Sequence, residues 1–481
     1  MHIGDKLTLF EARQPHKIAI YFEDEAITYA RFVKNVKRFQ HRLLKHVESD
    51  EAQKVALCID NEPAFLEMYF AVITLGWIAV PLDAKWTKKE AEQHMQLAKP
   101  DLIVGSRQFE KLANYQVRAT FMIEEVSEEQ FIVEKKVTAD TAFYLGFTSG
   151  STGQSKAFVR SHQSWLASFA AAEKAFHYGQ EDMILATGPL AYSLSLFATV
   201  HAIHIGASIC LLPKFTVKKT MHAIVSKQVS VVHAVPTMLA DLARHKAQVK
   251  NKITFISAGA KLLPNVREKA MKVFPNSHIF EYYGASELSL VSYANKEIAE
   301  NYPASVGKPF EGVNVTIRDQ AGNLLPCGDI GQIYIESDFV FKGYIDNETE
   351  NQKVLTAYGA TTSDLGYLNE AGYLFILGRN NNMLIRGGQN VYPEEIEKVI
   401  KAVPSVKEAV VIGVEDERWG EQIWALIQWE DVGDMKHLRS FCRQHIASHK
   451  RPHKYVVVDH FPYTSTGKID RKNINIRMGV R

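Results

Sequence analysis

The stretch Thr148–Lys156 carries side chains of the kind that bind a polyphosphate. It follows an apolar run, Ala142–Phe147, that is typical of a buried strand. Its two glycines allow a tight turn with backbone N–H groups pointing inward, five hydroxyls add donors, and Lys156 adds positive charge. The spacing differs from that of P-loop NTPases, because no second glycine stands directly before a Lys-Ser/Thr pair.

A flexible Ser/Gly linker would share this composition. A linker, however, rarely follows a buried strand, ends in lysine and leads into a helix. A helical segment is what we expect directly after Lys156. The loop by itself leaves the phosphate-binding and linker interpretations open.

Polar and aromatic residues cluster again at Glu281–Glu287, at the expected end of a strand, where α/β sheets place their ligands. Tyr283 offers a flat face for a purine, and Glu287 offers the hard carboxylate oxygen that Mg²⁺ prefers. In isolation, a surface turn with a buried aromatic residue would explain the same cluster.

Two shorter clusters follow towards the C-terminus. Asp364 could accept hydrogen bonds from both hydroxyls of a ribose, and Arg379 could reach the sugar or a phosphate. Lys468 ends the polar run Thr464–Lys468. Taken alone, a plain turn and an exposed polar tail explain these two clusters equally well.

In this order and at this spacing, the four clusters resemble those of the adenylate-forming superfamily. That superfamily includes acyl-CoA synthetases, aryl-CoA ligases, firefly luciferase and the adenylation domains of nonribosomal peptide synthetases. The resemblance runs from about Thr28 to Lys468. Further matching segments are Pro189-Leu190, Val235–Thr237, Ser257–Ala260, Ser305–Pro309, Gly343-Tyr344 and Arg386–Glu397.

The resemblance implies a role for each cluster, with ATP, Mg²⁺ and coenzyme A as cofactors. The expected nucleotide-binding residues are Thr148, Ser149, Gly150, Ser151, Thr152, Gly153, Lys156, Gly259, Ala260, Tyr283, Gly284, Ser286, Asp364, Arg379 and Lys468. Glu287 would hold Mg²⁺. Lys468 would stabilise the charge that develops when a carboxylate attacks the α-phosphate, so Lys468, Glu287, Thr148 and Lys156 are the expected catalytic residues.

The resemblance also implies that a small C-terminal domain turns about a hinge and presents a second face for thioester formation. The hinge position is Asn381, where an acidic residue is common, and the second face includes Arg386, Gly387 and Gly388. Three other departures keep small residues: Ser155 for proline, Ser286 for threonine and Ser363 for glycine. We expect activity to survive all of them.

The segment Gly188–Phe197 matches the acyl-pocket region, and we expect Tyr192, Ser193 and Leu196 to line it together with Gly259 and Gly284. Amino-acid-activating relatives carry an aspartate where Tyr192 stands. With no acid in this segment, a buried α-ammonium group would lack a partner, which costs several kcal/mol. An apolar acid is therefore expected.

Three functions stay open. The first is an acyl-CoA synthetase, with a fatty acid slightly ahead of an aryl acid such as a benzoate or succinylbenzoate. The second is a stand-alone ligase that loads an acyl or peptidyl carrier protein. The third is a silent relative that only binds nucleotide, against which the intact residues Lys156, Glu287, Asp364, Arg379 and Lys468 argue.

The elements that position these residues are expected to form an α/β fold. At 481 residues the chain should hold two to four domains. Short apolar strands alternate with amphipathic helices up to about residue 310. We expect a large N-terminal adenylation domain over residues 1–380, with a β-rich subdomain at about 311–380. A small mobile α+β domain over 381–481 carries Lys468 and a helix at Pro393–Lys401.

Composition narrows the partners to small molecules. The 56 basic and 54 acidic residues give a net charge of only +2, which offers no case for a nucleic-acid or membrane partner. The longest apolar run, Met68–Leu82, is short of the roughly 20 residues that span a bilayer, and is expected to be a buried helix followed by a strand. Four scattered cysteines fit a reducing compartment, the cytoplasm. Monomer and homodimer both stay open.

Overall fold

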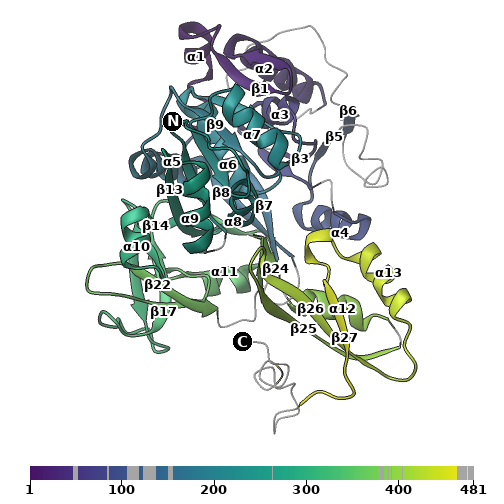
Figure 1. Ribbon diagram of the computed structural model, residues 1–481. Coiled ribbons are helices and arrows are strands. Elements are labelled where there is room, and N and C mark those ends of the chain that lie inside the picture. The colour runs from purple at the N-terminus through teal and green to yellow at the C-terminus, as the bar shows by residue number, and fades with distance from the viewer. Residues whose placement is uncertain are drawn as a thin grey trace.

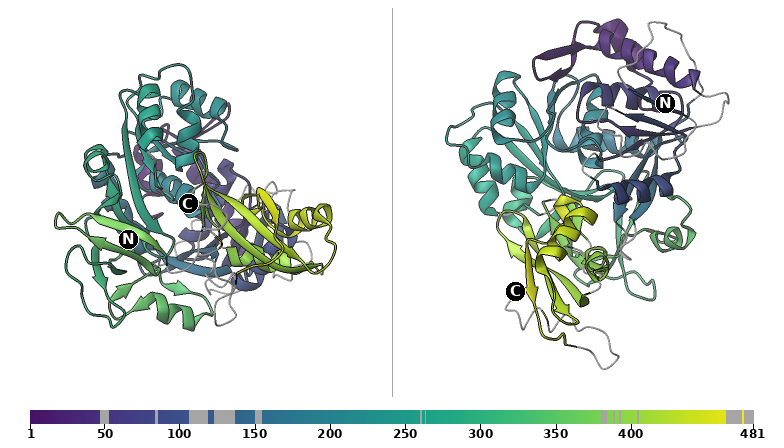
Figure 2. Two further views of the ribbon diagram at one scale, coloured as in Figure 1. Left: turned by 60° about the horizontal axis from the view of Figure 1, so that its bottom comes forward. Right: turned by 90° about the vertical axis from the view of Figure 1, so that its right-hand side faces the viewer.

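The computed structural model describes residues 1–46, 53–83, 86–105, 119–122, 137–149, 155–259, 261–262, 264–379, 384–387, 389–391, 393–403, 405–462 and 474. A large N-terminal part and a smaller C-terminal part lie side by side in all three views (Figures 1 and 2). Within the described residues, no helix combines the length and apolar character that crossing a bilayer requires.

The largest sheet has a parallel half. Its neighbouring strands are β1 (Ile18–Phe22), β10 (Ser208–Leu211), β9 (Met183–Ala186), β11 (Val231–Ala234), β12 (Thr254–Ser257) and β13 (His278–Ala285). The connecting helices are α6 (Ser193–Ile205), α7 (Val217–Ser226), α8 (Pro236–Leu242) and α9 (Pro264–Val273). These strands are apolar on both faces, as expected of parallel strands that are covered on both sides. The sequence pattern of residues 17–22 and 25–28 predicts a short hairpin, and β2 (Glu25–Thr28) is indeed antiparallel to β1.

Alternate residues of the parallel strands face two different cores. Val231 of β11 packs in the same cluster as Leu196 and Val200 of α6. Its neighbour Val232 packs with Met221 of α7 on the other side. Successive side chains of a strand point to opposite faces, so β11 divides these two cores.

The antiparallel half of the same sheet continues from β13 through β14 (Ser289–Ala294), β15 (Ser305–Pro309), β22 (Leu374–Arg379), β21 (Asp364–Leu368) and β17 (Gly331–Glu336). Strands β16 (Asn314–Arg318), β19 (Leu355–Thr356) and β20 (Gly359–Ala360) and helices α10 (Lys296–Asn301) and α11 (Glu348–Val354) complete this β-rich region. The sequence patterns of residues 313–318, 332–337 and 373–377 predict short strands, and β16, β17 and β22 match them within one or two residues at each end.

A second sheet has the order β18-β8-β7-β4-β3-β5-β6. Its strands are β18 (Gly343–Tyr344), β8 (Ser155–Ser161), β7 (Ala142–Ser149), β4 (Ile78–Pro81), β3 (Lys54–Cys58), β5 (Leu102–Gly105) and β6 (Ala119–Met122). Helices α1 (Leu7–Arg13), α2 (Tyr29–Lys45), α3 (Pro63–Thr74) and α4 (Lys88–Ala98) belong to the same N-terminal region. The apolar run from Met68 is the end of α3 and then β4, as predicted.

The expectation of a helix directly after Lys156 was wrong. Residues Ser155–Ser161 form strand β8, which lies between β7 and β18, and helix α5 (His162–Phe176) begins only afterwards. Phe158 and Val159 are buried within this hairpin. Pairing on both edges stabilises the extended conformation, so the loop joins two antiparallel strands rather than a strand and a helix.

The C-terminal part has its own sheet and core. The sheet contains β24 (Gln389–Val391), β23 (Leu384–Arg386), β26 (Gly420–Trp429), β25 (Val406–Asp416) and β27 (Lys454–Val457). Helix α12 (Pro393–Lys401) has the predicted bounds and packs on this sheet with α13 (Met435–His445). The chain is thus a mixed α/β protein with a large N-terminal and a small C-terminal domain, as expected.

Helix α4 of the large part lies next to α13 of the small part (Figure 1). The N–H of Ala447, just after α13, donates a buried hydrogen bond of 3.1 Å to Oε1 of Glu90 on α4. On the other side of the interface, Arg418 donates to Asp241 Oδ2 of α8 at 3.1 Å. These bonds hold the two parts in the observed arrangement.

Candidate active site

The strands that flank the loop 148–156 place Thr148 and Lys156 opposite each other. Lys156 forms an ion pair with Glu350 of α11, and its Nζ lies 5.1 Å from the centre of the Tyr344 ring. Burial alone would raise the pKa of Glu350, but the hydrogen bonds from Lys156 and Lys353 outweigh it and lower that pKa. The lysine predicted to bind phosphate is therefore held by a carboxylate that the sequence analysis missed.

Glu287, the predicted Mg²⁺ ligand, is buried at the turn after β13. Its Oε1 accepts a hydrogen bond from Tyr344 Oη at 2.6 Å and a longer one from Thr148 Oγ1 at 3.4 Å. A carboxylate and a hydroxyl that face each other supply hard oxygen ligands, and Mg²⁺ completes its shell with water and phosphate oxygens. The residues therefore fit the ion. Within the described residues, no group of three His, Cys, Asp or Glu side chains could hold a metal by itself.

Arg160 of β8 hydrogen-bonds the backbone of this turn. The sequence analysis did not single out this residue. Its Nη1 donates to the carbonyl oxygens of Ser286 at 3.1 Å and Glu287 at 3.2 Å. Burial lowers the pKa of Arg160 to about 9. The buried guanidinium of Arg160 thus orients the turn that carries the predicted residues Ser286 and Glu287.

Tyr283 and Asp364 meet across two strands. Oδ2 of the buried Asp364 accepts hydrogen bonds from Tyr283 Oη and, at 2.7 Å, from Thr362 Oγ1. Arg379 is the register partner of Asp364 on β22. Ser363, which stands where the superfamily commonly has glycine, has φ of 61°, a backbone conformation that favours glycine. The structure thus brings the predicted purine and ribose residues together.

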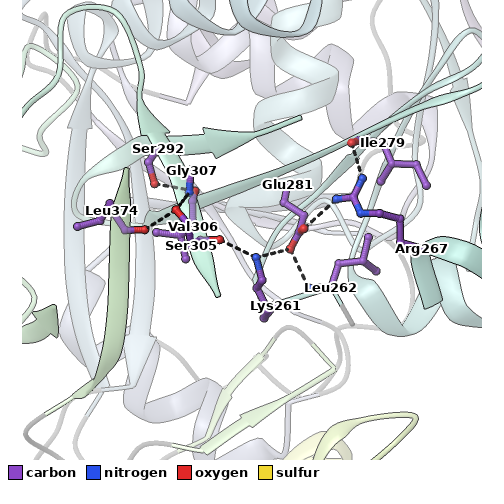
Figure 3. Close-up of polar contacts among 10 residues, drawn as sticks. All are labelled: Lys261, Leu262, Arg267, Ile279, Glu281, Ser292, Ser305, Val306, Gly307 and Leu374. Carbon is purple, nitrogen blue, oxygen red and sulfur yellow. Dashed lines mark hydrogen bonds and ion pairs between the residues drawn. The ribbon is translucent and has the colours of Figure 1, made fainter. Parts of the chain in front are cut away.

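The segment after β12, which contains Gly259, is anchored by Glu281 of β13 (Figure 3). Glu281 accepts from Leu262 N at 2.9 Å and from Arg267 Nη2 at 2.8 Å. Lys261 Nζ lies 3.6 Å from the same carboxylate and donates to Ser305 O at 2.7 Å. A buried carboxylate needs such partners. The glutamate in the otherwise apolar strand was a signal that the sequence analysis quoted but gave no role.

Gly284 allows a close backbone approach beside this segment. A Cβ at this position would lie 2.0 Å from the carbonyl oxygen of Ser289 on β14. No side chain fits there without moving the backbone. Gly284 therefore keeps β13 and β14 close where the purine and acid residues are expected to meet.

The residues predicted to line the acid pocket stand at the start of α6. Tyr192 is its N-cap residue, Ser193 its first residue, and Leu196 is fully buried one turn later. Tyr192 Oη donates to Asp83 Oδ2 at 2.6 Å, and Ser193 Oγ lies 3.1 Å from Tyr144 Oη. The segment itself contains no acidic residue, as noted from the sequence. In the fold, however, the buried Asp83, which follows β4, lies next to it. Burial and the nearby Asp83 raise the pKa of Tyr192.

The loop predicted to serve the thiol step has contacts in both parts of the molecule. Arg386 donates to His449 O, and its guanidinium lies 5.1 Å from the centre of the Trp419 ring. A Cβ at Gly387 would lie 3.6 Å from Thr237 Oγ1 of α8. Gly387 thus lies next to α8 of the large domain, whereas the partners of Arg386 belong to the small domain.

Several predicted residues lie outside the described part of the chain, namely Gly150, Ser151, Thr152, Gly153, Ala260, Asn381, Gly388 and Lys468. The side chains of Ser149 and Arg379 are likewise not described. Among the described predictions, the residues fall into two groups. The nucleotide side contains Thr148, Lys156, Tyr283, Glu287 and Asp364, and the acid side contains Tyr192, Ser193 and Leu196.

Comparison with known proteins shows which family the chain belongs to. The sequence profile of AMP-binding enzymes matches residues 8–345, and that of the AMP-binding enzyme C-terminal domain matches residues 395–468. The chain is 34% identical over 464 residues to the "uncharacterized acyl–CoA ligase YhfT" of Bacillus subtilis, which covers 96% of this chain and 95% of the relative. It is 29% identical to the 2-succinylbenzoate–CoA ligase of Bacillus velezensis over 96% of this chain and 95% of that protein. A provisionally named long chain fatty acid–CoA ligase of Staphylococcus epidermidis is 30% identical with the same two coverages.

Two solved structures of one similar enzyme differ in how well they superpose. A double mutant of the o-succinylbenzoate CoA synthetase of Bacillus subtilis, bound to its product analogue OSB-NCoA, gives a TM-score of 0.91 at 25% identity and covers 98% of both chains. The same synthetase with its acyl-adenylate OSB-AMP gives only 0.75 at 25% identity, covering 97% of both. The two TM-scores thus differ although the identity is the same and the coverage is nearly equal.

Proposed function

The chain belongs to the AMP-binding enzyme family and is an AMP-forming acid–thiol ligase, and we propose that it activates an apolar carboxylic acid with ATP and passes the acyl group to coenzyme A. The observation that carries this proposal is the nucleotide-side group, in which Thr148 and Tyr344 donate hydrogen bonds to the carboxylate of Glu287. In the same group, Tyr283 donates to the carboxylate of Asp364. The similar CoA ligases support the acceptor thiol.

In the first half-reaction, a carboxylate oxygen of the acid bonds to the α-phosphorus of ATP, and the bond to pyrophosphate breaks. Thr148 and Lys156 would bind the departing phosphates, and Asp364 would bind the ribose. Glu287, assisted by Thr148, would hold Mg²⁺, which supplies positive charge next to the triphosphate. Lys468 would stabilise the charge at the α-phosphate.

Lys156 must exchange Glu350 for a phosphate before it can act. Both side chains are largely buried, with 10% and 15% of their surface exposed. The ion pair keeps the ammonium group in place and compensates its charge when no phosphate is present. We therefore propose that Glu350 releases Lys156 when ATP binds.

In the second half-reaction, the thiolate sulfur bonds to the acyl carbon, and AMP leaves with the electron pair of the broken C–O bond. We propose that the observed arrangement serves this step. The higher TM-score with the OSB-NCoA complex supports this proposal, as does the position of Gly387 next to Thr237 of α8. Residues 381–481 would turn about Asn381 between the two steps.

The acid is proposed to be a fatty acid, with an aryl or succinylbenzoate-like acid as the alternative. The buried side chains Leu190, Leu196 and Phe197 support an apolar acid. The described cysteines are free thiols, which supports a reducing compartment, the cytoplasm.

The proposed function is tested by exchange of labelled pyrophosphate into ATP across a panel of fatty, aryl and amino acids. We expect exchange with at least one apolar acid and none with amino acids. If no acid supports exchange while the protein is folded, the proposal is refuted. Supplying coenzyme A or a phosphopantetheinylated carrier protein to the active acid then identifies the acceptor, and faster transfer to the carrier protein would favour the carrier-loading alternative.

A further inference from the structure

A buried histidine, His233, faces the same core as the helix that begins in the expected acyl region. His233 is the third residue of β11 and is two positions from Val231, so it faces the same core as the α6 residues Leu196 and Val200. Its carbonyl oxygen accepts hydrogen bonds from Thr187 N at 3.2 Å and Thr187 Oγ1 at 2.9 Å. Thr187 directly precedes the segment 188–197. The imidazole is therefore attached to the scaffold of the proposed acid site.

The imidazole of His233 is 3% exposed, and neither ring nitrogen has a hydrogen-bond partner among the described residues. A buried polar group without a partner costs about 1–3 kcal/mol. Burial lowers the pKa of His233 to about 3, so the ring is neutral and presents one donor and one acceptor. Such a group is suited to a neutral ligand oxygen, which can accept from the ring N–H or, as a hydroxyl, donate to the other nitrogen.

Neighbouring polar groups already have partners. Tyr178 Oη and His201 Nδ1 are 2.6 Å apart, and His201 Nε2 lies 3.1 Å from Glu173 Oε1. Tyr178 packs its ring edge against His233, with centroids 6.2 Å apart. This chain of hydrogen bonds fixes the side chains of Tyr178 and His201 next to His233. It does not involve the ring nitrogens of His233.

The depth of His233 can be derived from the secondary structure. His233 pairs with Ile256 on β12, which ends at Ser257, and Gly259 follows Ile256 by three residues, so Gly259 lies no more than about 10 Å from the level of His233. Helix α6 rises about 12 Å over the eight residues from Ser193 to His201. His201 hydrogen-bonds Tyr178, whose ring contacts His233, so His233 lies near that end of the helix. An acid whose carboxyl group lies near Gly259 would reach His233 with its far end.

We propose that His233 is a specificity-determining residue that hydrogen-bonds a neutral oxygen group, a hydroxyl or a ketone, at the far end of the acid. This inference rests on the proposed function, because it concerns the acid of the same reaction. This assignment predicts that the enzyme disfavours acids with a second carboxylate at that end. A neutral imidazole would leave the buried charge of such a carboxylate without a countercharge. The substrate class is thus an apolar acid that carries oxygen up to about 10 Å from its carboxyl carbon.

The test compares terminal hydroxy acids of 6 to 12 carbons with the matching unsubstituted acids by pyrophosphate exchange. We expect the wild type to prefer the hydroxy acid at one or two lengths by about tenfold or more in kcat/KM, because only that acid satisfies the imidazole. In His233→Leu this preference should disappear and the unsubstituted acid should gain. His233→Gln, which keeps a donor and an acceptor, should retain part of the preference.

The matched control is Thr220→Val on α7, where another fully buried oxygen lacks a partner among the described residues but lies on the α7 side of β11. It should leave the ratio of the two acids unchanged. The inference is overturned if the wild type shows no preference at any length, or if His233→Leu changes both acids equally. Should His233→Leu fail to fold, the wild-type panel and His233→Gln still decide. Failure of every acid would instead refute the proposed function.

Discussion

The nucleotide side and the acid side of the proposed site are held together in different ways. On the nucleotide side, charged groups meet partners directly: Lys156 contacts Glu350, and Asp364 contacts Tyr283. On the acid side, Tyr192 covers the buried Asp83, and His233 has no partner among the described residues.

The difference follows from the ligands. ATP brings fixed charges and hydroxyls, so the residues that bind it need charge and hydrogen-bonding capacity of defined type. An acyl chain brings mainly apolar surface, so shape and a few polar groups decide which chain is accepted. The nucleotide side should therefore be sensitive to single charge changes, and the acid side to single changes in polarity.

The largest effect is expected for Lys468→Ala. Loss of the positive charge at the α-phosphate should lower adenylation by about 10³-fold or more, while thioester formation from preformed acyl-adenylate stays largely intact. The two half-reactions are measured separately, with Lys436→Ala on α13 as an exposed-lysine control. Equal loss in both half-reactions would contradict the proposed alternation of the C-terminal domain.

The second effect concerns the carboxylate of the nucleotide side. Glu287→Gln keeps the shape but removes the charge that would hold Mg²⁺, and we expect about 10²–10³-fold lower pyrophosphate exchange that more Mg²⁺ partly restores. Tyr344→Phe removes only one hydrogen bond to Glu287 and should cost far less activity. If both variants lose the same activity with no response to Mg²⁺, Glu287 does not act as a metal ligand.

On the acid side, Tyr192→Phe should mainly affect stability. Removing the hydroxyl takes a donor at 2.6 Å from the buried Asp83, which should lower the free energy of unfolding by about 1–3 kcal/mol. Chemical denaturation measures this loss. The nucleotide side should be unaffected, so the KM for ATP should not change. A large rise in that KM would show that the two sides are not independent.

The interface between the two domains gives a smaller effect. Arg418→Ala removes an exposed ion pair with Asp241, worth up to about 1 kcal/mol, so thioester formation should slow by no more than about fivefold. Arg244→Ala is the matched control, since Arg244 lies 3.6 Å from the same carboxylate but within the large domain. Adenylation should be unchanged in both variants. Slowing of adenylation by Arg418→Ala would mean that this contact does not distinguish the two arrangements.

The smallest effect is expected at Ser363. Its φ of 61° strains a residue with a Cβ, so Ser363→Gly should raise the free energy of unfolding by up to about 1 kcal/mol. The conformation that positions Asp364 is the same, and kcat should not change. Thermal unfolding and steady-state kinetics test both statements, and a destabilised variant would show that the serine side chain contributes a contact.

The sequence by itself determined the local elements and the order of the chemical groups. Strand β11 coincides with the apolar run Val231–Ala234, and helix α12 has the predicted bounds, because apolar pattern and a proline at the first helical position act over a few residues. Thr148, Tyr283, Glu287 and Asp364 were identified for a related reason: each stands in a short motif whose residues are neighbours in the chain.

Only the tertiary structure decided which of these groups meet. Lys156 and Glu350 are 194 residues apart, Tyr192 and Asp83 are 109 apart, and Ala447 and Glu90 are 357 apart. No local pattern encodes such a pairing. The same holds for β8, which is a strand because β7 and β18 pair with its two edges. It also holds for His233, whose unpartnered nitrogens appear only when α6 covers the sheet. These contacts depend on how separate elements pack, and packing is a property of the whole chain.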